Sequence, residues 1–213
     1  GARSDIRDGY YQFSNHRIAD YFELRFKVRA GDFGVTEVYD PETDGPIPVK
    51  PNDLVWPVVE AMPMGWSWAL HVCTDALEHV VRITGTGRDL ARERCEAPLM
   101  TVAEPVCSVY VDNINVHGIN SESCDRRHEV IIAALEARGF SLHEITQASQ
   151  HHKQLGVCFD GVARVLRHGP RRLWRVHLAL RCLLRMGGAR PRVVRVLTGH
   201  LVHIFSIARP LLS

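Results

Sequence analysis

The stretch VCSVYVDNINV, residues 106–116, is rich in β-forming residues and has a short polar break at Asp112 and Asn113. A break of this kind between two apolar runs is typical of a β-hairpin. We therefore expect two paired strands with the acidic side chain at their turn. An aspartate in a turn is most often structural, but at a hairpin tip it is also well placed to bind a cation.

A second carboxylate is expected at the end of another strand, in DIRDGYYQF (residues 5–13). This short, aromatic-rich segment is typical of a strand that leads into a turn. Two-metal phosphoryl transfer requires carboxylates from separate elements, which converge to hold two divalent ions about 3.5–4 Å apart. Either segment alone is weak evidence for such a site. As a pair, Asp5 and Asp112 are candidate metal ligands.

Between these segments, MPMGWSW (residues 62–68) predicts a sharp turn that leads into a helix at 67–82. Apolar residues recur at spacings of three and four along that helix. Glycine has no Cβ, so the backbone at Gly65 can approach a flat ligand closely. The alternative interpretation is a loop-to-helix junction with buried tryptophans.

The rest of the chain divides into further elements by periodicity and by its Pro and Gly residues. The expected elements are strands at 21–28 and 54–61 separated by a loop at 31–51, a surface excursion at 85–104, a helix at 123–138, a strand at 155–159, and helices at 170–186 and 191–208. This order favours an α+β fold with an antiparallel sheet backed by helices over a doubly wound parallel sheet.

Composition indicates a folded globular chain, because 46% of its 213 residues are apolar. The sequence shows no signal-peptide pattern and no apolar run of membrane-spanning length, so we expect an intracellular protein without a membrane partner. The six cysteines are spread singly, which argues against structural zinc and a disulfide framework and favours reduced core thiols.

Charge is distributed very unevenly along the chain. Residues 161–213 contain eleven of the 26 Lys and Arg residues and none of the 24 Asp and Glu residues. A basic segment of this kind suits a polyanion such as nucleic acid. Solvated helix faces are the other interpretation, but no acidic residues balance these arginines.

Taken together and in this order, the segments resemble the reverse transcriptase family. The first palm motif of that family, Asp-x-x-Asp-(Ala/Gly)-(Tyr/Phe)-aromatic, matches residues 5–11, and its (Leu/Met)-Pro-x-Gly-(Phe/Trp) motif matches residues 62–66. Its aromatic-x-Asp-Asp motif resembles residues 110–113, except that Asn113 replaces the second aspartate. An amide offers a cation a neutral oxygen, so weaker ion binding is expected.

The resemblance continues beyond these three motifs. LEARGFSLH at 135–143 is similar to the fourth motif, Leu155-Gly156 to the primer-grip hairpin, and 171–213 to the thumb. It implies an α+β polymerase palm at 1–162, followed by a helical, basic, thumb-like segment at 163–213. It also implies that the fingers precede Asp5.

The resemblance assigns roles to individual residues. The implied catalytic residues are Asp5, Asp112 and Asn113; the implied metal ligands are Asp5, Asp112 and the backbone carbonyl of Ile6, which would hold two Mg²⁺ or Mn²⁺ ions. The implied nucleotide-binding residues are Tyr10, Met64 and Gly65. The implied contacts to primer or other nucleic acid are Tyr110, Leu155, Gly156, Arg171, Arg175, Arg181 and Arg185.

The implied activity is RNA-directed DNA polymerisation, with an RNA or DNA template-primer and deoxynucleoside triphosphates as partners. A bulky ring at Tyr10 would collide with a 2′-hydroxyl and so favour deoxynucleotides. The alternative is a decayed polymerase fold that binds nucleic acid without catalysis, which Asn113 and the missing fingers favour. A two-metal nuclease is a third and more distant interpretation.

Overall fold

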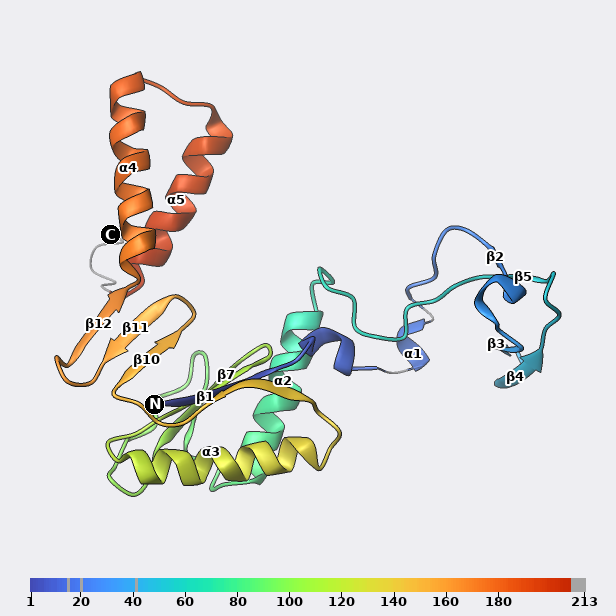
Figure 1. Ribbon diagram of the computed structural model, residues 1–213, viewed down its shortest axis with the longest axis horizontal. Helices are drawn as coiled ribbons and strands as arrows, with labels where there is room; N and C mark the ends of the chain where they lie inside the picture. Colours follow the sequence, from blue (N-terminus) through green and yellow to red (C-terminus); the bar gives the residue numbers. More distant parts are fainter. Residues whose placement is uncertain (15, 20, 41, 208–213) are drawn as a thin grey trace.

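The largest sheet of the computed structural model is mixed and has five strands in the order β6-β7-β8-β1-β9; it lies above α3 at the lower left of Figure 1. The structure describes residues 1–14, 16–19, 21–40 and 42–207. The strands of this sheet are β1 (Ala2–Ile6), β6 (Leu90–Ala91), β7 (Val106–Tyr110), β8 (Asn113–His117) and β9 (Leu142–Thr146). The α+β class is therefore confirmed, and so is the hairpin expected at 106–116.

The expectation of a purely antiparallel sheet is wrong at one edge. Strand β6 runs parallel to β7, whereas the other three strand pairs are antiparallel. Strand β6 lies inside the segment expected to be a surface excursion. The chain between β6 and β7, residues 92–105, is long enough for the return crossover that a parallel pair needs.

Two helices cover one face of this sheet, α2 (Ala69–Ile83) and α3 (Ser121–Glu136). Both were expected, with ends displaced by one or two residues. Side chains alternate across the sheet, so every second residue of β1 faces these helices and is buried. The core between the sheet and the helices consists of Ile6, Leu77, Val80, Val81, Leu90, Cys107, Ile114, Val116, Cys124, Ile131 and Leu135. All six cysteines are free thiols, and three of them are buried.

A second, three-stranded sheet consists of β10 (His151–Gln154), β11 (Val157–Asp160) and β12 (Val165–His168). It packs on the polar side of the main sheet through hydrogen bonds. His152 Nε2 lies 3.2 Å from Asn115 Oδ1, and Gln154 lies 2.9 Å from His117. The strand expected at 155–159 is therefore only partly correct, because residues 155 and 156 form the turn between β10 and β11.

Two packed helices end the described chain, α4 (Pro170–Met186) and α5 (Pro191–Phe205), as expected from the sequence. Each begins with proline at its first turn, and Gly187 ends α4 with a left-handed φ of 65°. Helix α5 ends three residues before the expected boundary at 208, which lies outside the described residues. Within these two helices only Val176 and Leu197 are buried.

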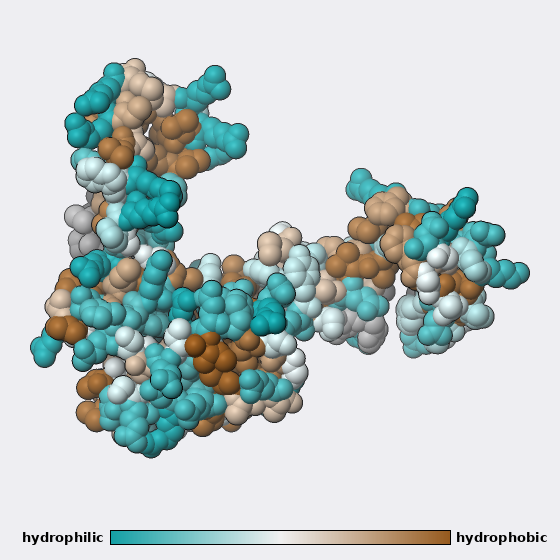
Figure 2. Space-filling view, viewed as in Figure 1, coloured by the Kyte–Doolittle hydropathy of each residue, from teal (hydrophilic) through white to brown (hydrophobic). Residues whose placement is uncertain are grey.

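The described residues between 14 and 61 form an arm that extends away from the main sheet (Figure 1). Its short elements are α1 (His16–Ala19), β2 (Val28–Arg29), the 3₁₀ helix η2 (Ala30–Phe33), β3 (Glu37–Asp40), β4 (Gly45–Pro48) and β5 (Leu54–Val55). Apolar patches remain visible on the surface of this arm (Figure 2). A helix long and apolar enough to span a membrane does not occur in the described part of the chain.

The strands expected at 21–28 and 54–61 are wrong over most of their length. Only Val28 of the first segment joins a strand, and Glu23 makes a single isolated bridge to Val58. In the second segment only Leu54 and Val55 form a strand. Neither segment lies in the main sheet, so their alternating side chains have no broad layer to pack against.

Candidate active site

One candidate carboxylate, Asp5, lies on strand β1, and the other, Asp112, lies in the turn that leads into the neighbouring strand β8. Asp5, near the end of β1, lies opposite Asn113, the first residue of β8. The backbone N–H of Ile6 donates a 2.9 Å hydrogen bond to the carbonyl oxygen of Asp112. Residues more than a hundred positions apart in the chain are therefore brought together by strand pairing.

The turn that carries Asp112 is a two-residue loop, because Tyr110 still pairs with Asn113. The first loop residue, Val111, has a φ of 57°. Its N–H donates a 3.1 Å hydrogen bond to Thr74 Oγ1 on α2. Val111 is also buried against Met62 and Cys73, so the turn is attached to the beginning of α2.

A close backbone approach puts Gly9 directly against Asp112. Gly9 begins the 3₁₀ helix η1 (Gly9–Gln12), which follows β1. A Cβ at Gly9 would lie 2.6 Å from the Cβ of Asp112 and 3.2 Å from its Oδ2. No side chain fits there, so glycine is required at this position by contact.

The environment of Asp5 favours its protonated form. Burial is the main cause that raises the pKa of Asp5, and the charge of Asp112 raises it further. His143 and Arg3 act in the opposite direction. The Oδ1 atom of Asp5 is buried without a hydrogen-bond partner. Two carboxylates that repel each other, one with an unpartnered oxygen, are suited to a cation between them.

Asn113 contacts the site through its amide group. Its Nδ2 donates a 2.8 Å hydrogen bond to Asp112 Oδ1. This bond occupies one oxygen of the carboxylate and orients it. The side chain assigned by resemblance to catalysis therefore acts here as a donor to a metal-ligand candidate, a role that a second aspartate would not fill when ionised.

Asp5 and Asp112 supply hard oxygen donors, which suit Mg²⁺ or Mn²⁺. Within residues 1–14, 16–19, 21–40 and 42–207, no three His, Cys, Asp or Glu side chains gather closely enough to hold a metal. Mg²⁺ is typically bound by one or two carboxylates, with water and substrate phosphates as its other ligands. The donor set therefore fits a cation that binds together with a phosphate-bearing ligand. Ile6 lies at the site, with its side chain in the core.

Two tyrosines, Tyr10 and Tyr110, lie next to the carboxylates. Tyr10 packs with Met62, Cys73 and Val111. Burial raises the pKa of Tyr10, and the nearby groups of Cys73, Asp112 and Tyr110 add to this effect. Tyr110 ends β7 and keeps 45% of its surface exposed. The structure therefore brings together Tyr10, Tyr110 and Asp112.

Met64 and Gly65 lie on the exposed turn before α2. Met64 keeps 69% of its surface exposed, and Gly65 has a φ of 97° with open space around its Cβ position. Glycine is needed at position 65 because it adopts a positive φ freely. At position 9 it is needed for a different reason, because a side chain would collide with Asp112.

The residues expected to contact primer or other nucleic acid lie at the second sheet and on α4. Leu155 and Gly156 have positive φ angles of 48° and 84° and form the tip of the β10–β11 hairpin. A Cβ at Gly156 would lie 2.9 Å from Nη1 of Arg172. Arg172 was not singled out from the sequence, because only the fold shows that α4 returns to this hairpin.

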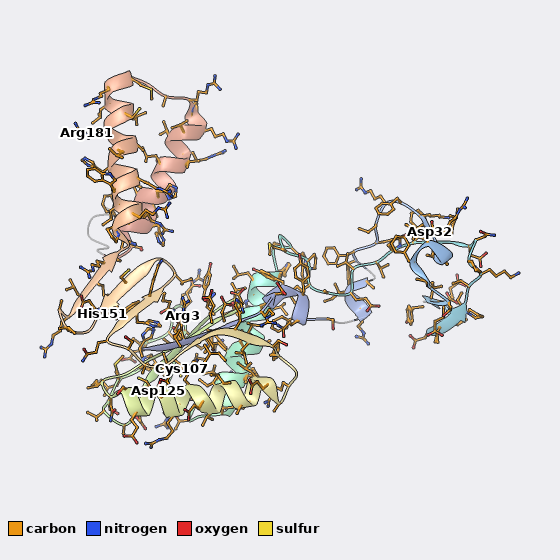
Figure 3. The ribbon with its side chains drawn as sticks, viewed as in Figure 1. Arg3, Asp32, Cys107, Asp125, His151 and Arg181 are labelled. Atoms are coloured by element: carbon orange, nitrogen blue, oxygen red, sulfur yellow. The ribbon has the colours of Figure 1, made fainter. Side chains whose placement is uncertain are left out.

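Of the four arginines expected on α4, two line the groove against α5 and two do not. Arg171 and Arg175 line a groove of about 810 Å³ between α4 and α5. Arg181 projects from α4 on the side away from α5 (Figure 3), and Arg185 is exposed. The groove is apolar along its floor, where Val176 and Leu197 lie.

Two residues at the carboxylates were missed by sequence reasoning, Thr74 and His143. Thr74 occupies a helix position with no motif of its own. His143 lies opposite Asp5 in the β1–β9 register, which is visible only after the strands are paired. In comparisons with known proteins, no family model matches the chain and a search of the curated proteins finds no match.

Proposed function

We propose that the chain is part of a reverse transcriptase-like polymerase that synthesises DNA on a template by two-metal-ion nucleotidyl transfer. In this proposal residues 1–162 are the palm and residues 163–213 belong to the thumb. The observation that carries it is the placement of Asp5, on β1, beside Asp112, in the turn that leads into the adjacent antiparallel strand β8, with an unpartnered buried oxygen on Asp5.

In this proposal Asp5 and Asp112 would hold the two metal ions. When bound there, Mg²⁺ would supply activation of the attacking 3′ oxygen and neutralisation of charge on the leaving pyrophosphate. The protein itself contributes orientation: Asn113 fixes one oxygen of Asp112, and Gly9 leaves room for that carboxylate.

The surroundings of the carboxylates support a nucleotide and a primer end as ligands. Tyr10 would lie beneath the sugar and exclude a 2′-hydroxyl, and Tyr110 would contact the primer end. Met64 and Gly65, on an open turn, would border the nucleotide. The basic helices would follow phosphates without reading sequence, as a sliding enzyme requires.

A second candidate function is nucleic-acid binding without catalysis. It is favoured by Asn113, which removes one negative charge from the site and donates a hydrogen bond to Asp112. A site with two carboxylates attracts cations more weakly than one with three.

Primer extension on RNA and DNA templates with Mg²⁺ or Mn²⁺ tests the proposal, alongside Mn²⁺ binding by the free chain. We expect Asp112→Asn to abolish extension and weaken Mn²⁺ binding, and Asn113→Asp to strengthen Mn²⁺ binding. Glu93→Gln is the matched control, because Glu93 is a fully exposed carboxylate beside Arg94 in the segment after β6.

Unchanged Mn²⁺ affinity in Asp112→Asn would overturn the assignment of the site. If neither the chain nor Asn113→Asp extends a primer while both bind nucleic acid in a salt-sensitive way, the non-catalytic function is the better account.

A further inference from the structure

The tip of the β7–β8 hairpin has a backbone conformation that its sequence disfavours. Val111 has a φ of 57°, in the region where β-branched residues are rare. A two-residue hairpin loop with positive φ at its first position resembles a type II′ turn, which favours glycine there. Strain of this kind persists only where surrounding contacts impose it, and it clusters at functional sites.

Two contacts impose this conformation, and both come from the α2 side. The N–H of Val111 donates a 3.1 Å hydrogen bond to Thr74 Oγ1. The side chain of Val111 is only 5% exposed and packs in a cluster with Met62, Ala69 and Cys73. The side-chain packing holds the tip in place, while the hydroxyl fixes the direction of the peptide group.

The next residue after Val111 is Asp112. Its carbonyl oxygen accepts the Ile6 N–H at 2.9 Å, and its carboxylate accepts the Asn113 amide. A rotation of the Val111 peptide would displace both groups, because they follow it by one residue. Thr74, on α2, is therefore linked to the Asp112 carboxylate through the backbone of one residue, Val111.

We propose that Thr74 is a positioning residue whose hydroxyl holds the Val111 backbone and thereby directs the Asp112 carboxylate toward Asp5. The proposal rests on the proposed function only for the identity of the ligand, a divalent cation. The connection from Thr74 to Asp112 is a statement about the protein alone and can be tested without metal.

The test compares Thr74→Val, which keeps the shape but loses the hydroxyl, with Thr74→Ser, which keeps the hydroxyl. Thr198→Val is the matched control, because Thr198 is exposed on α5 and its hydroxyl donates a hydrogen bond to the Val194 carbonyl of the same helix. Amide hydrogen exchange of Val111 and Ile6 is measured by NMR without metal, and Mn²⁺ affinity is measured separately.

We expect Thr74→Val to speed exchange of the Val111 amide roughly tenfold and to speed that of Ile6 as well, because Ile6 reports on Asp112. Loss of an outer contact to a metal ligand lowers metal affinity by roughly tenfold or more. Thr74→Ser should keep the exchange rates and the Mn²⁺ affinity close to those of the unmodified chain. Thr198→Val should change neither quantity.

A second substitution, Val111→Gly, tests the strain itself. Glycine adopts a positive φ freely, so the Thr74 hydroxyl is needed less to hold residue 111 in this conformation. We expect Thr74→Val to reduce Mn²⁺ affinity less in the Val111→Gly background than in the unmodified chain.

Unchanged exchange at Ile6 in Thr74→Val would overturn the positioning role, whatever the metal data show. If the unmodified chain binds no Mn²⁺ but Ile6 exchange rises in Thr74→Val, the metal site fails and the positioning role stands.

Discussion

Strands are expected from the sequence both at 106–116 and in the arm segment at 21–28, yet only the first segment forms strands along its length. The hairpin lies between β1 and β6 and has two helices against one face. The arm segment has a two-residue partner strand. A strand-forming sequence therefore becomes a strand only where a neighbouring strand and a covering layer are both present.

The same contrast holds for apolar burial. Leu77, in the core under the main sheet, is fully buried, whereas Leu54 in the arm keeps 59% of its surface exposed. Tyr21 and Phe33 in the arm are exposed by 81% and 69%. The main sheet with α2 and α3 should therefore provide most of the stability of the chain, and the arm little.

The largest expected effect comes from truncating one leucine in each region. Leu77→Ala should lower the free energy of unfolding by about 3 kcal/mol, because it removes buried methyl groups and leaves a cavity. Leu54→Ala should change it by less than about 0.5 kcal/mol. Urea unfolding followed by circular dichroism measures both, and equal losses would contradict the contrast.

The next effect concerns the junction between the main sheet and the second sheet. Burial, with a smaller effect from His117, lowers the pKa of His152 from 6.5 to about 4. The unfolded chain therefore binds a proton that the folded chain rejects between these values, so stability falls as pH falls through this window.

Between pH 7 and pH 5 this loss should be about 2 kcal/mol, and His152→Gln should remove that part of it. The pKa values of His117 and His128 are lowered as well, chiefly by burial, so some loss should remain in the variant. The measurement is urea unfolding at a series of pH values. Identical pH dependence in both proteins would contradict the assignment.

A smaller effect separates two glycines. Gly9→Ala places a Cβ 2.6 Å from that of Asp112, whereas at Gly45 in the arm the nearest atom is 3.8 Å away. Overpacking of this kind costs about 1–3 kcal/mol. We expect Gly9→Ala to lower both the unfolding free energy and Mn²⁺ affinity, and Gly45→Ala to change neither appreciably. Thermal unfolding and Mn²⁺ titration check this pair.

The smallest effect concerns two aspartates whose pKa values are shifted in opposite directions. Burial and the neighbouring Asp112 raise the pKa of Asp5, whereas the Thr43 hydroxyl and the N–H of Glu42 lower that of Asp40. Asp5 therefore favours folding at acidic pH and loses that contribution as pH rises through its folded pKa. Asp40 favours folding above its unfolded pKa and loses that contribution as pH falls.

NMR titration of the two carboxyl carbons should place Asp5 above 3.8 and Asp40 below it. Asp5→Asn should stabilise the chain at neutral pH by less than about 1 kcal/mol, because solvent screens much of the repulsion. A shift of both carboxyls in the same direction would contradict the comparison.

Much of the candidate site could be predicted from short motifs, because Asp5, Tyr10, Gly65 and Asp112 each lie in a segment with its own local signal. The paired contacts could not be predicted in the same way. His143 faces Asp5 only through the β1–β9 register, and Thr74 reaches Val111 only because α2 packs beside the hairpin.

Elements whose signals are local form where the sequence predicts them. Proline at the start and glycine at the end placed α4 at 170–186, and β-forming residues around a polar pair placed the hairpin at 106–116. Three features depend instead on tertiary contacts. They are the parallel edge strand β6, the mostly non-strand conformation of residues 21–28, and the strained backbone at Val111. Helix ends and turns depend on neighbouring residues, whereas strand pairing and burial depend on residues far away in the chain.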